Sequence, residues 1–442
     1  MTRTPSQTDA RMYVESLARS ARLAAGQLAA LPDATKRSAL HRMAAAIQEQ
    51  RALLLEANAK DIAAAQQAGL AQALIERLKL NDKRIESMAS GVEQIANQTD
   101  TVGRTIEGYS RPNGLRIEKR RVPIGVVLFF YESRPNVTSD AAALCIKSGN
   151  AIILRGGKEA IHSNRAIVKI IKDSLSSLGS SPGVPASAGM SPPDLTDAVQ
   201  FIDNPDRALV PIILKLDKYI DLVIPRGGES LIRAVVADST IPVLKHFTGN
   251  CHIYVDAGAE AMEQKVREVC VNAKTSYPGG AVCNAVEHIL FHKDVAPKLL
   301  AKVCADLAAK GVEVRGDECA VQHYMAAKAA TPEDWGTEYL AFIVGIKVVD
   351  SIDEAIAHIN EYGSHHTDAI LSTSIDSINK FVTNVDSASV MVNASTRFAD
   401  GGEYGLGAEI GISTDKLHAR GPMGAADLTT YKWVVTGEGH VR

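Results

Sequence analysis

The chain has 442 residues, more than one hydrophobic core usually holds, so two or three domains are expected. Its 48 basic and 51 acidic residues leave a formal net charge of −3, which disfavours a protein that binds nucleic acid or an anionic membrane. The longest apolar stretch, residues 122–131, is about half a membrane span and is broken by Pro123 and Gly125. Six cysteines without a C-x-x-C pair, and no apolar signal core at the N-terminus, predict a cytoplasmic protein with reduced thiols.

Residues 11–80 have the pattern of an alanine-rich helical region, and Asp33 is available there as an N-cap. The apolar residues recur at steps of three, four and seven, as on one helix face: Leu40, Met43, Ile47 and Leu54. Residues 104–121 change character, because the turn signal Tyr109-Ser-Arg-Pro-Asn-Gly114 is flanked by strand-like residues. This pattern predicts a β-hairpin arm.

Three apolar segments follow, at residues 124–131, 151–154 and 221–224, and each leads into a helical pattern. This alternation predicts βαβ units in a mostly parallel sheet. Between the second and third units, residues 174–193 are rich in Ser, Pro and Gly, which predicts a long mobile surface loop.

A second α/β stretch is expected over residues 251–387, where Ser351 and Glu354 form a capping box for a helix at 352–359. Residues 393–424 are glycine-rich and polar, unlike a core segment, and residues 429–435 form a last strand.

Two glycine-rich turns stand where a predicted strand meets a helix, in Arg155-Gly-Gly-Lys158 and Arg226-Gly-Gly-Glu-Ser230. Glycines at such a junction let a phosphate approach backbone N–H groups and the positive end of the helix dipole. Each turn alone is also compatible with an ordinary tight connection, whereas the pair favours a nucleotide. Arg155 and Lys158 could bind the 2′-phosphate that NADP has and NAD lacks, so they favour NADP over NAD. The alternative is that both side chains simply lie in solvent. The residues expected at the cofactor are Arg155, Gly156, Gly157, Lys158, Arg226, Gly227, Gly228 and Ser230.

Cys283 differs from the other five cysteines, which lie in apolar or mixed runs. It follows Pro278, Gly279 and Gly280 in a loop. A thiol on such a loop can act as a nucleophile, with backbone N–H groups around it to bind an oxyanion. The alternative is a small buried hydrophobic residue.

Several long motifs support a family assignment. They are Ile124-Gly-Val-Val-Leu-Phe-Phe-Tyr-Glu-Ser-Arg-Pro-Asn-Val-Thr, Lys147-Ser-Gly-Asn-Ala-Ile-Ile-Leu-Arg-Gly-Gly-Lys-Glu-Ala, Glu361-Tyr-Gly-Ser-His-His-Thr-Asp-Ala and Leu417-His-Ala-Arg-Gly-Pro-Met-Gly. With these motifs the chain resembles, from its N-terminal helices to its last strand, the glutamate-5-semialdehyde dehydrogenases. This family is also called the gamma-glutamyl phosphate reductases and belongs to the aldehyde dehydrogenase superfamily.

The resemblance implies an aldehyde dehydrogenase-like α/β fold in three parts. A discontinuous Rossmann-type cofactor domain would comprise residues 1–105, 122–250 and 388–424. An α/β catalytic domain would comprise residues 251–387, and a small β oligomerisation arm residues 106–121 and 425–442.

The resemblance also implies the reaction: NADPH-dependent reduction of L-glutamyl 5-phosphate to L-glutamate 5-semialdehyde, the second step of proline biosynthesis from glutamate. It implies a homodimer or higher homo-oligomer, without a metal, and a functional association with a separate glutamate 5-kinase is a further expectation. Cys283 falls on the family's catalytic cysteine, Glu338 on a glutamate at the cofactor ribose, and Arg155 on a basic residue at the adenosine ribose. Two departures are the enlarged link 279–282 before Cys283 and the insertion 174–193.

Hydrolytic members of the superfamily carry a water-activating glutamate before a Gly-Gly-Lys, whereas this chain reads Val243-Leu-Lys-His-Phe-Thr-Gly-Asn-Cys. Oxidation to a free acid needs a base that aims water at the thioester. Reduction of an acyl phosphate needs no water, so the missing glutamate favours a reductase. Its mechanism would pass through a thioacyl intermediate on Cys283.

The anionic groups of the substrate are expected to meet Arg134 and Arg397, because a guanidinium matches carboxylate and phosphate. Arg134 is equally compatible with a structural ion pair. Glu132 is a candidate for the substrate amine, and Asn136 for the oxyanion.

His366 is a candidate for binding phosphate or donating a proton. Its neighbour His365 should point the opposite way on an extended segment, so only one of the pair is expected at the site.

Two alternatives stay open. One is a dehydrogenase of the same superfamily that acts on another acyl phosphate or on an acyl-CoA. The other is an inactive oligomerising or binding partner, which only the unusual loop before Cys283 suggests.

Overall fold

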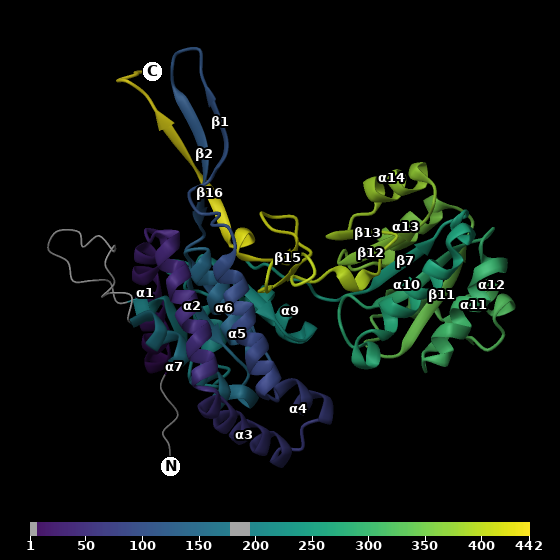
Figure 1. Ribbon diagram of the computed structural model, residues 1–442, viewed down its shortest axis with the longest axis horizontal. Helices are drawn as coiled ribbons and strands as arrows, with labels where there is room; N and C mark the ends of the chain where they lie inside the picture. The colour runs from purple at the N-terminus through teal and green to yellow at the C-terminus, as the bar shows by residue number, and fades with distance from the viewer. Residues whose placement is uncertain (1–6, 177–194) are drawn as a thin grey trace.

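The computed structural model describes residues 7–176 and 195–442. Figure 1 shows two α/β lobes, with a narrow β arm that projects from the lobe containing the N-terminal helices. The parallel sheets of both lobes confirm the expected α/β class. Most of the predicted loop 174–193 lies outside the described residues, and residues 174–176 are the end of helix α7. Among the described helices, none is both long and apolar enough to cross a membrane.

The first lobe begins with five helices: α1 (Gln7–Ala29), α2 (Asp33–Glu49), α3 (Arg51–Gln67), α4 (Gln72–Leu78) and α5 (Asp82–Asn97). Its sheet has the order β5-β4-β3-β6, with all strands parallel. The strands are β3 (Val126–Tyr131), β4 (Ala151–Arg155), β5 (Val199–Phe201) and β6 (Leu222–Arg226). The helical segments between and after them are α6 (Asn136–Lys147), η1 (Lys158–Ala160), α7 (Ile161–Ser176), η3 (Leu195–Ala198), α8 (Leu209–Ile213) and α9 (Glu229–Asp238).

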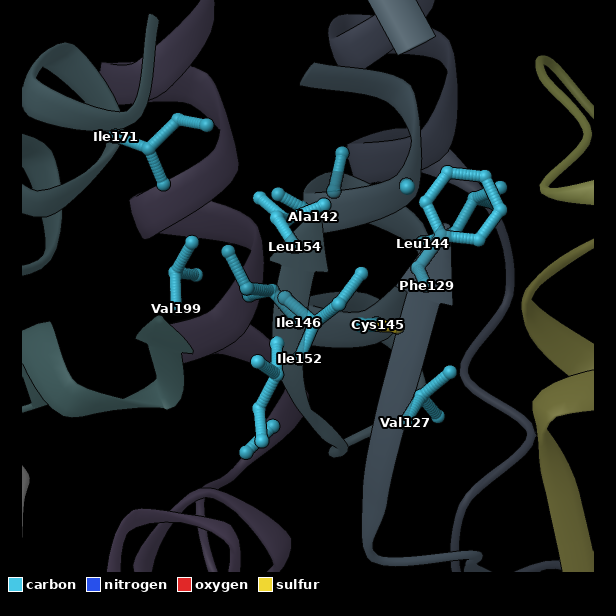
Figure 2. Close-up of a cluster of buried hydrophobic side chains, with 14 of the residues drawn as sticks. Val127, Phe129, Ala142, Leu144, Cys145, Ile146, Ile152, Leu154, Ile171 and Val199 are labelled. Atoms are coloured by element: carbon cyan, nitrogen blue, oxygen red, sulfur yellow. The ribbon is translucent and has the colours of Figure 1, made fainter. Parts of the chain in front are cut away.

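Strand β3 lies between β4 and β6, and all six of its residues are buried. A strand that is covered on both faces needs apolar residues at every position, which is why the sequence shows a continuous run rather than an alternation. Figure 2 shows Val127 and Phe129 of β3 among side chains from neighbouring elements, such as Leu154 and Ile171.

The second lobe contains a seven-stranded parallel sheet of order β10-β9-β11-β8-β7-β12-β13. Its strands are β7 (Cys251–Val255), β8 (Val286–His292), β9 (Glu313–Gly316), β10 (Lys328–Ala329), β11 (Ile343–Val349), β12 (Thr367–Leu371) and β13 (Ser389–Val392). The α-helices are α10 (Glu263–Thr275), α11 (Ala296–Ala309), α12 (Glu318–His323), α13 (Ile352–Tyr362) and α14 (Ile375–Asn384). The 3-10 turns are η4 (Ala259–Met262), η5 (Pro278–Gly280) and η6 (Pro332–Gly336).

The expected domain boundary at residue 388 is wrong in one respect. Strand β13 begins at Ser389 and pairs with β12, while Met391 and Ala399 pack in the core of the second lobe. The chain returns to the first core only by Ile410. A short hydrophobic strand therefore completes the second sheet before the glycine-rich segment crosses back. The assignment of one lobe to the cofactor and the other to catalysis stays a proposal.

The arm is an antiparallel sheet of β1 (Thr105–Ser110), β2 (Arg116–Pro123) and β16 (Thr429–Thr436). The predicted hairpin and the predicted last strand are therefore confirmed. The closing segment before β16 contains η7 (Thr396–Phe398), β14 (Gly411–Ser413), β15 (Gly421–Met423) and η8 (Ala425–Leu428).

The two predicted helix caps had different outcomes. Ser351 caps α13, because its side chain accepts from the Glu354 N–H. The predicted capping box is incomplete, since the Glu354 carboxylate accepts from the Asp350 N–H and not from that of Ser351. Asp33 does not cap α2; its carboxylate instead lies 2.8 Å from the Nζ atom of the buried Lys147. A buried ammonium needs a charged partner more than a helix end needs a cap.

Asn150 connects the first lobe to the end of the chain. Its side chain, which is fully buried, accepts from the Gly125 N–H at 2.7 Å and donates to the Leu428 carbonyl at 2.8 Å. The residue therefore fixes the start of β3 against the segment that leads into β16.

We expect Asn150→Ala to lower the free energy of unfolding by about 2–4 kcal/mol, because it leaves both backbone groups without their partner. Urea unfolding in a Trp335→Phe background measures this, since Trp433 on β16 is then the single tryptophan. Asn113→Ala in the exposed hairpin turn is the matched control and should leave the midpoint unchanged. An unchanged midpoint for Asn150→Ala would contradict the structural role.

Candidate active site

Cys283 lies in the loop between η5 and β8, where the chain is tightly constrained. Gly279 and Gly280 have φ angles of 68° and 67°, which favour glycine. A Cβ atom on Gly249 would lie 1.9 Å from the Cys283 carbonyl oxygen, so only glycine fits beside this backbone. That carbonyl also accepts from the Cys251 thiol at 3.1 Å. The enlarged link 279–282 therefore ends in a fixed position for Cys283.

Two imidazoles face the Cys283 thiol. One ligand atom from each of Cys283, His246 and His366 lies within 4.8 Å of the other two. The two rings are T-shaped, with centroids 5.2 Å apart. His246 lies between α9 and β7, and its Nδ1 atom is 3.0 Å from the Ile412 carbonyl oxygen. His366 immediately precedes β12, and its Nδ1 atom is 2.9 Å from the Thr367 hydroxyl. Each imidazole therefore has one nitrogen engaged by the protein.

The electrostatics favour a thiolate at Cys283. Burial raises the pKa of this thiol, but the charge of His366 and the hydrogen bond and charge of His246 outweigh it and hold the pKa well below its usual value. Burial lowers the pKa of His246, and its hydrogen bond and charge interaction with Cys283 reverse this and raise the pKa. Cys283 is thus arranged as a thiolate beside the imidazole of His246, which favours its charged form.

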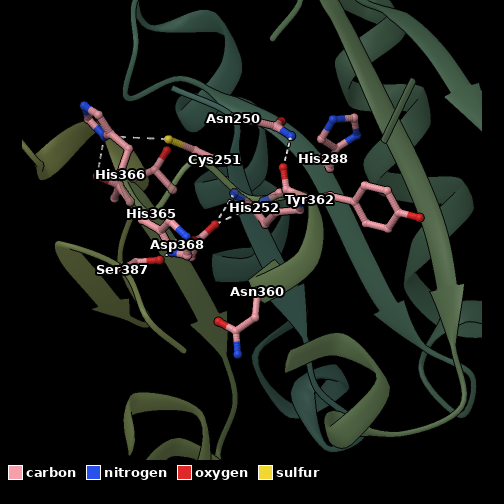
Figure 3. A network of polar contacts seen from close by, with 12 residues as sticks. Asn250, Cys251, His252, His288, Asn360, Tyr362, His365, His366, Asp368 and Ser387 are labelled. Carbon is pink, nitrogen blue, oxygen red and sulfur yellow. Dashed lines mark hydrogen bonds and ion pairs between the residues drawn. The ribbon is translucent and has the colours of Figure 1, made fainter. Parts of the chain in front are cut away.

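Figure 3 shows how the segment around His366 is held in the second lobe. His366 and Cys251 lie side by side, with 3.9 Å between Sγ and Nδ1. The side chain of His365 is engaged by another segment, because its Nδ1 atom is 2.7 Å from the Asp386 carbonyl oxygen. Asp368, two residues further along, accepts from the backbone N–H of His252 at 2.7 Å. Of the adjacent pair, only His366 is brought to the cysteine.

Glu338, expected at the cofactor ribose, is half-buried near Cys283. Burial raises the pKa of its carboxyl group; a hydrogen bond from the Gly249 N–H opposes the rise, and the negative charge of Cys283 adds to it. The structure thus places Glu338 within electrostatic range of the thiolate.

A buried ion pair lies behind this loop. Lys274 on α10 and Glu287 on β8 are both fully buried and 2.7 Å apart. The other carboxylate oxygen of Glu287 is 3.4 Å from the backbone N–H of Leu340, which has a φ angle of 49°. The pair therefore supports the turn that follows Glu338.

A cavity of about 710 Å³ lies beside the cysteine loop. Its charged lining residues are Glu76, Arg77, Lys79, Arg84, Arg134, Asp140, Arg226, Asp400 and Glu409. Tyr277, Pro278 and Ala281 of the cysteine loop also contribute to its wall. An opening with this many guanidinium groups is suited to a small anionic molecule.

Arg134 stands out among these cations. Burial lowers its pKa, and the charges of Arg226 and Arg77 lower it further. Tyr277 and Cys283 act in the opposite direction. None of these is a carboxylate, and no ion pair forms on Arg134 among the described residues. The structural ion pair considered for Arg134 is therefore absent from the described part of the chain.

Asn136 is the first residue of α6 and lines the same cavity. Its amide donates to Asp140 at 3.1 Å. Burial raises the pKa of Asp140 to about 6, against lowering contributions from Asn136 and Arg226. The Asn136 amide is thus engaged by a carboxylate on the cavity wall, and among the described residues it forms no hydrogen bond with Cys283.

Arg397 lies in η7, beside Tyr277. Its Nε atom donates to the Ser276 hydroxyl at 3.1 Å, and its guanidinium carbon is 5.6 Å from the centre of the Tyr277 ring. One of its terminal nitrogens is buried and has no hydrogen-bond partner. A buried donor in this state is available to an anionic group.

The glycine-rich turns lie at the carboxyl ends of β4 and β6, on either side of β3. Two carboxylates occupy them. Glu159 accepts from the Ser133 N–H at 2.8 Å, and a Cβ on Gly157 would lie 2.1 Å from its oxygen. Glu132 accepts from the Gly228 N–H at 3.1 Å. The structure therefore places the Glu132 carboxylate at the second turn, and its expected role at the substrate amine stays a prediction.

The remaining cofactor candidates are side chains near the turns and glycines within them. Arg155 extends towards the Pro205 and Asp206 carbonyls at 3.5 and 3.4 Å, while Lys158 and Ser230 are exposed near the turns. A Cβ on Gly156 would lie 2.2 Å from the Asn164 amide, so this glycine is needed for packing. Gly227 is exposed beside Glu132.

Arg226 belongs to the cavity rather than to its own turn. Its guanidinium lies 3.5 Å from the Glu409 carboxylate, and it lines the same wall as Arg134.

Sequence reasoning missed His246 and Asp140. The signal for His246 was present, since it lies in the segment 243–251 where a glutamate is missing. Asp140 lies one helical turn after Asn136, and this spacing places both on one face of α6.

Comparisons with known proteins agree with this architecture. The model of the aldehyde dehydrogenase family matches residues 3–322. The gamma-glutamyl phosphate reductase of Geotalea daltonii is 49% identical over 430 residues, which are 97% of this chain and 98% of that protein. The same-named protein of Caldanaerobacter subterraneus subsp. tengcongensis is 48% identical over 98% of this chain and 100% of its own.

Solved structures give the same result. The crystal structure of gamma-glutamyl phosphate reductase from Thermotoga maritima has a TM-score of 0.90 and 44% identity, and the match covers 97% of this chain and 99% of that chain. An acetylating aldehyde dehydrogenase from Geobacillus thermoglucosidasius has a TM-score of 0.65 at 17% identity over 98% of both chains, which shows the shared fold. The expected fold class is confirmed.

The thiolate at Cys283 makes a prediction about pH. The rate at which iodoacetamide alkylates Cys283 should have its midpoint well below the value of about 8.5 for a free cysteine. Replacing His366 or His246 by Asn removes a favourable charge, so the midpoint should move upward by about one to three pH units. Mass spectrometry of the alkylated peptide measures both. Alkylation of the exposed Cys319 is the internal control and should not differ between the variants. A midpoint that the histidine variants leave unchanged would contradict this account of the thiolate.

Proposed function

The chain belongs to the aldehyde dehydrogenase family and, within it, to the gamma-glutamyl phosphate reductases, and we propose that it reduces L-glutamyl 5-phosphate to L-glutamate 5-semialdehyde. The reductant is NADPH and the second product is inorganic phosphate. The reaction is the second step of proline biosynthesis from glutamate. The observation that carries the proposal is a cysteine with a strongly lowered pKa, grouped with two histidines, in a loop whose neighbouring residues line an arginine-rich cavity.

The first step uses Cys283 as the nucleophile. Its thiolate attacks the γ-carbonyl carbon, a C–S bond forms, and the bond between that carbon and the phosphate oxygen breaks. The leaving phosphate gains a proton, for which the imidazoles of His246 and His366 are the nearest donors. The product of this step is a thioester on Cys283.

The developing oxyanion needs donors close to the sulfur. The backbone N–H of Cys283 donates to no carbonyl within the described part of the chain, so it is free to donate to the substrate. Asn136 remains a candidate for the second donor if its amide leaves Asp140 when the substrate binds.

When bound, NADPH supplies a hydride to the thioester carbon. The C–S bond of the resulting thiohemiacetal then breaks, which releases the aldehyde and restores the thiolate. His246 and His366 stabilise the same thiolate at the beginning and at the end of the cycle. Because His246 stands in the segment where hydrolytic relatives carry a glutamate, the chain offers no carboxylate there to direct water at the thioester.

The substrate has three charged groups besides the reacting carbon. Arg134 and Arg397 support binding of the phosphate and the α-carboxylate, because both offer guanidinium nitrogens that are not engaged by a carboxylate. Asp140 lies on the cavity wall beside Asn136 and is, with Glu132, a candidate for the α-ammonium group.

The residues present fit a nicotinamide dinucleotide phosphate. The Nε atom of Arg155 is buried without a hydrogen-bond partner, and the terminal nitrogens reach only distant carbonyls. Arg155 would hold the 2′-phosphate with Lys158 beside it, and Glu338 would hold a ribose. The turns at Gly157 and Gly228 would hold the diphosphate once Glu159 and Glu132 have turned away.

The arm is the expected contact between copies of the chain. Exposed aromatic and aliphatic side chains on its strands support a homodimer or a higher homo-oligomer: Ile106, Tyr109, Tyr431, Trp433 and Val435. Association with a separate glutamate 5-kinase stays a prediction.

The reverse reaction tests the function directly. With L-glutamate 5-semialdehyde and NADP, we expect NADPH to form only when inorganic phosphate is added. The absorbance of NADPH measures this, and Cys283→Ser should abolish it. Formation that needs coenzyme A instead of phosphate would favour the acyl-CoA dehydrogenase and contradict the proposal. No turnover with either acceptor would leave the inactive binding partner as the better account.

Cofactor preference gives a second test. Arg155→Gln should raise the KM for NADP by about ten- to hundredfold, because a charge-assisted hydrogen bond to the 2′-phosphate is lost. The KM for NAD should stay unchanged. Arg165→Gln removes an exposed arginine paired with Asp203 and is the matched control. Equal losses with NADP and NAD would exclude the 2′-phosphate as the partner of Arg155.

A further inference from the structure

We propose that Cys283, His246 and His366 form a reversible binding site for Zn²⁺, and that zinc bound there inhibits the enzyme. The three residues come from separate parts of the chain, and within the described ranges they are the one group of three or more potential metal ligands whose ligand atoms converge. Binding of the ion is independent of the proposed function, whereas the inhibition rests on it.

The donor set is one that zinc prefers. A thiolate and two imidazoles match the ligands of tetrahedral zinc sites that have three protein ligands and one open position. Ligand atoms around tetrahedral zinc lie roughly 3.3–3.6 Å apart, given the usual Zn–N and Zn–S lengths. The three atoms already lie within 4.8 Å of each other. Side-chain rotations that bring them about 1 Å closer together would therefore complete the site.

The second layer of contacts also matches a metal site. A histidine that binds a metal commonly donates its other ring N–H to a backbone carbonyl or another oxygen. His246 directs Nδ1 to the Ile412 carbonyl, and His366 directs Nδ1 to the Thr367 hydroxyl. Both rings therefore leave Nε2 for the centre. For His366 this atom is buried and without a hydrogen-bond partner, as a vacant ligand would be.

The charges around Cys283 set the strength of binding. Glu338 adds negative charge nearby, whereas Arg134 opposes a dication. We therefore expect zinc to bind more weakly than in a closed structural site.

Another histidine cluster provides a useful contrast. His252, His288 and His358 are buried in the second lobe with ring centroids 5.1 and 5.6 Å from His252. Their nitrogens do not form a three-ligand group, and burial lowers the pKa of His288 and His358. Proximity of rings alone is therefore not enough, and the Cys283 group differs in that its ligand atoms converge.

Inhibition follows from the identity of the ligands. Zinc coordinated to the Cys283 sulfur removes the lone pair that attacks the acyl carbon. It also occupies the imidazoles that would protonate the leaving phosphate. Both effects end when a chelator removes the ion, since no covalent bond to the chain is altered.

Cobalt gives a direct test of the site. Co²⁺ added to the reduced, metal-free enzyme should produce the thiolate charge-transfer band and the visible bands of a tetrahedral thiolate complex, with one equivalent per chain. Zn²⁺ should bleach these bands by displacement. Cys283→Ala should abolish them, while His246→Asn and His366→Asn should each weaken binding by at least about tenfold.

The matched control addresses an exposed competitor. Cys319 and His323 lie one turn apart on α12, where a cysteine and a histidine can also bind a metal adventitiously. Cys319→Ser should leave the cobalt spectrum and zinc inhibition unchanged. If Cys319→Ser removes the bands, or Cys283→Ala keeps them, the proposal is overturned.

Two further readouts separate the possible failures. In the wild type, Zn²⁺ should protect Cys283 but not Cys319 from iodoacetamide, which needs neither a variant nor turnover; equal alkylation with and without zinc overturns the site. Zn²⁺ should also inhibit phosphate-dependent NADPH formation, with full recovery after EDTA. A cobalt spectrum that depends on Cys283 in a chain without this turnover would support the site while it refutes the proposed function.

Discussion

The catalytic centre depends on one electrostatic constraint: a thiolate has to stay ionised where burial favours the thiol. The chain meets this constraint with two imidazoles, those of His246 and His366, which are far apart in the sequence. His246 is fixed through Ile412 of the closing segment, near Val243, which pairs with the edge of the four-stranded sheet. His366 immediately precedes β12, which lies next to the edge strand β13 of the other sheet. The low pKa of Cys283 is therefore a property of the two lobes together, and a displacement of either lobe changes it.

The same constraint explains the order of the surrounding residues. Gly249 gives the Cys283 backbone room, and Cys251 holds its carbonyl, so the sulfur cannot move far from the histidines. The buried pair Lys274–Glu287 supports the turn that carries Glu338. A buried pair of this kind contributes little to stability, because desolvation of both charges offsets their attraction. Its value here lies in the position that it imposes on a loop at the reacting atoms.

Much of the fold was predictable because its signals are local. Fully buried parallel strands require continuous apolar runs, and the runs at β3, β4 and β6 show this pattern without any knowledge of their neighbours. The hairpin arm was likewise predictable from its turn residues. Asp33 was mispredicted because its partner, the buried Lys147, lies over a hundred residues away. The boundary at 388 failed because glycine-rich composition does not reveal that four residues still add a strand.

The site divides in the same way. Cys283 was predictable from its loop and its resemblance to a family, and His366 from its motif. His246 was not predicted, because the informative feature of the segment 243–251 was taken to be its missing glutamate and not the histidine that it contains. The positions of Glu132 and Arg226 depend on which side of a turn each side chain takes, and this follows from packing against Gly228 and Glu409 rather than from spacing.

The pairing of β16 with β2 bears on how the protein is made. These strands are separated by some three hundred residues, and Asn150 binds the carbonyl of Leu428 just before β16 begins. The second lobe is continuous in sequence, so it can fold while synthesis continues. The first lobe emerges earlier from the ribosome, yet its arm cannot form until the last strand is released. The first lobe is therefore synthesised first but completed last. Until β16 is available, the unpaired edge of β2 must avoid pairing with strands of other chains.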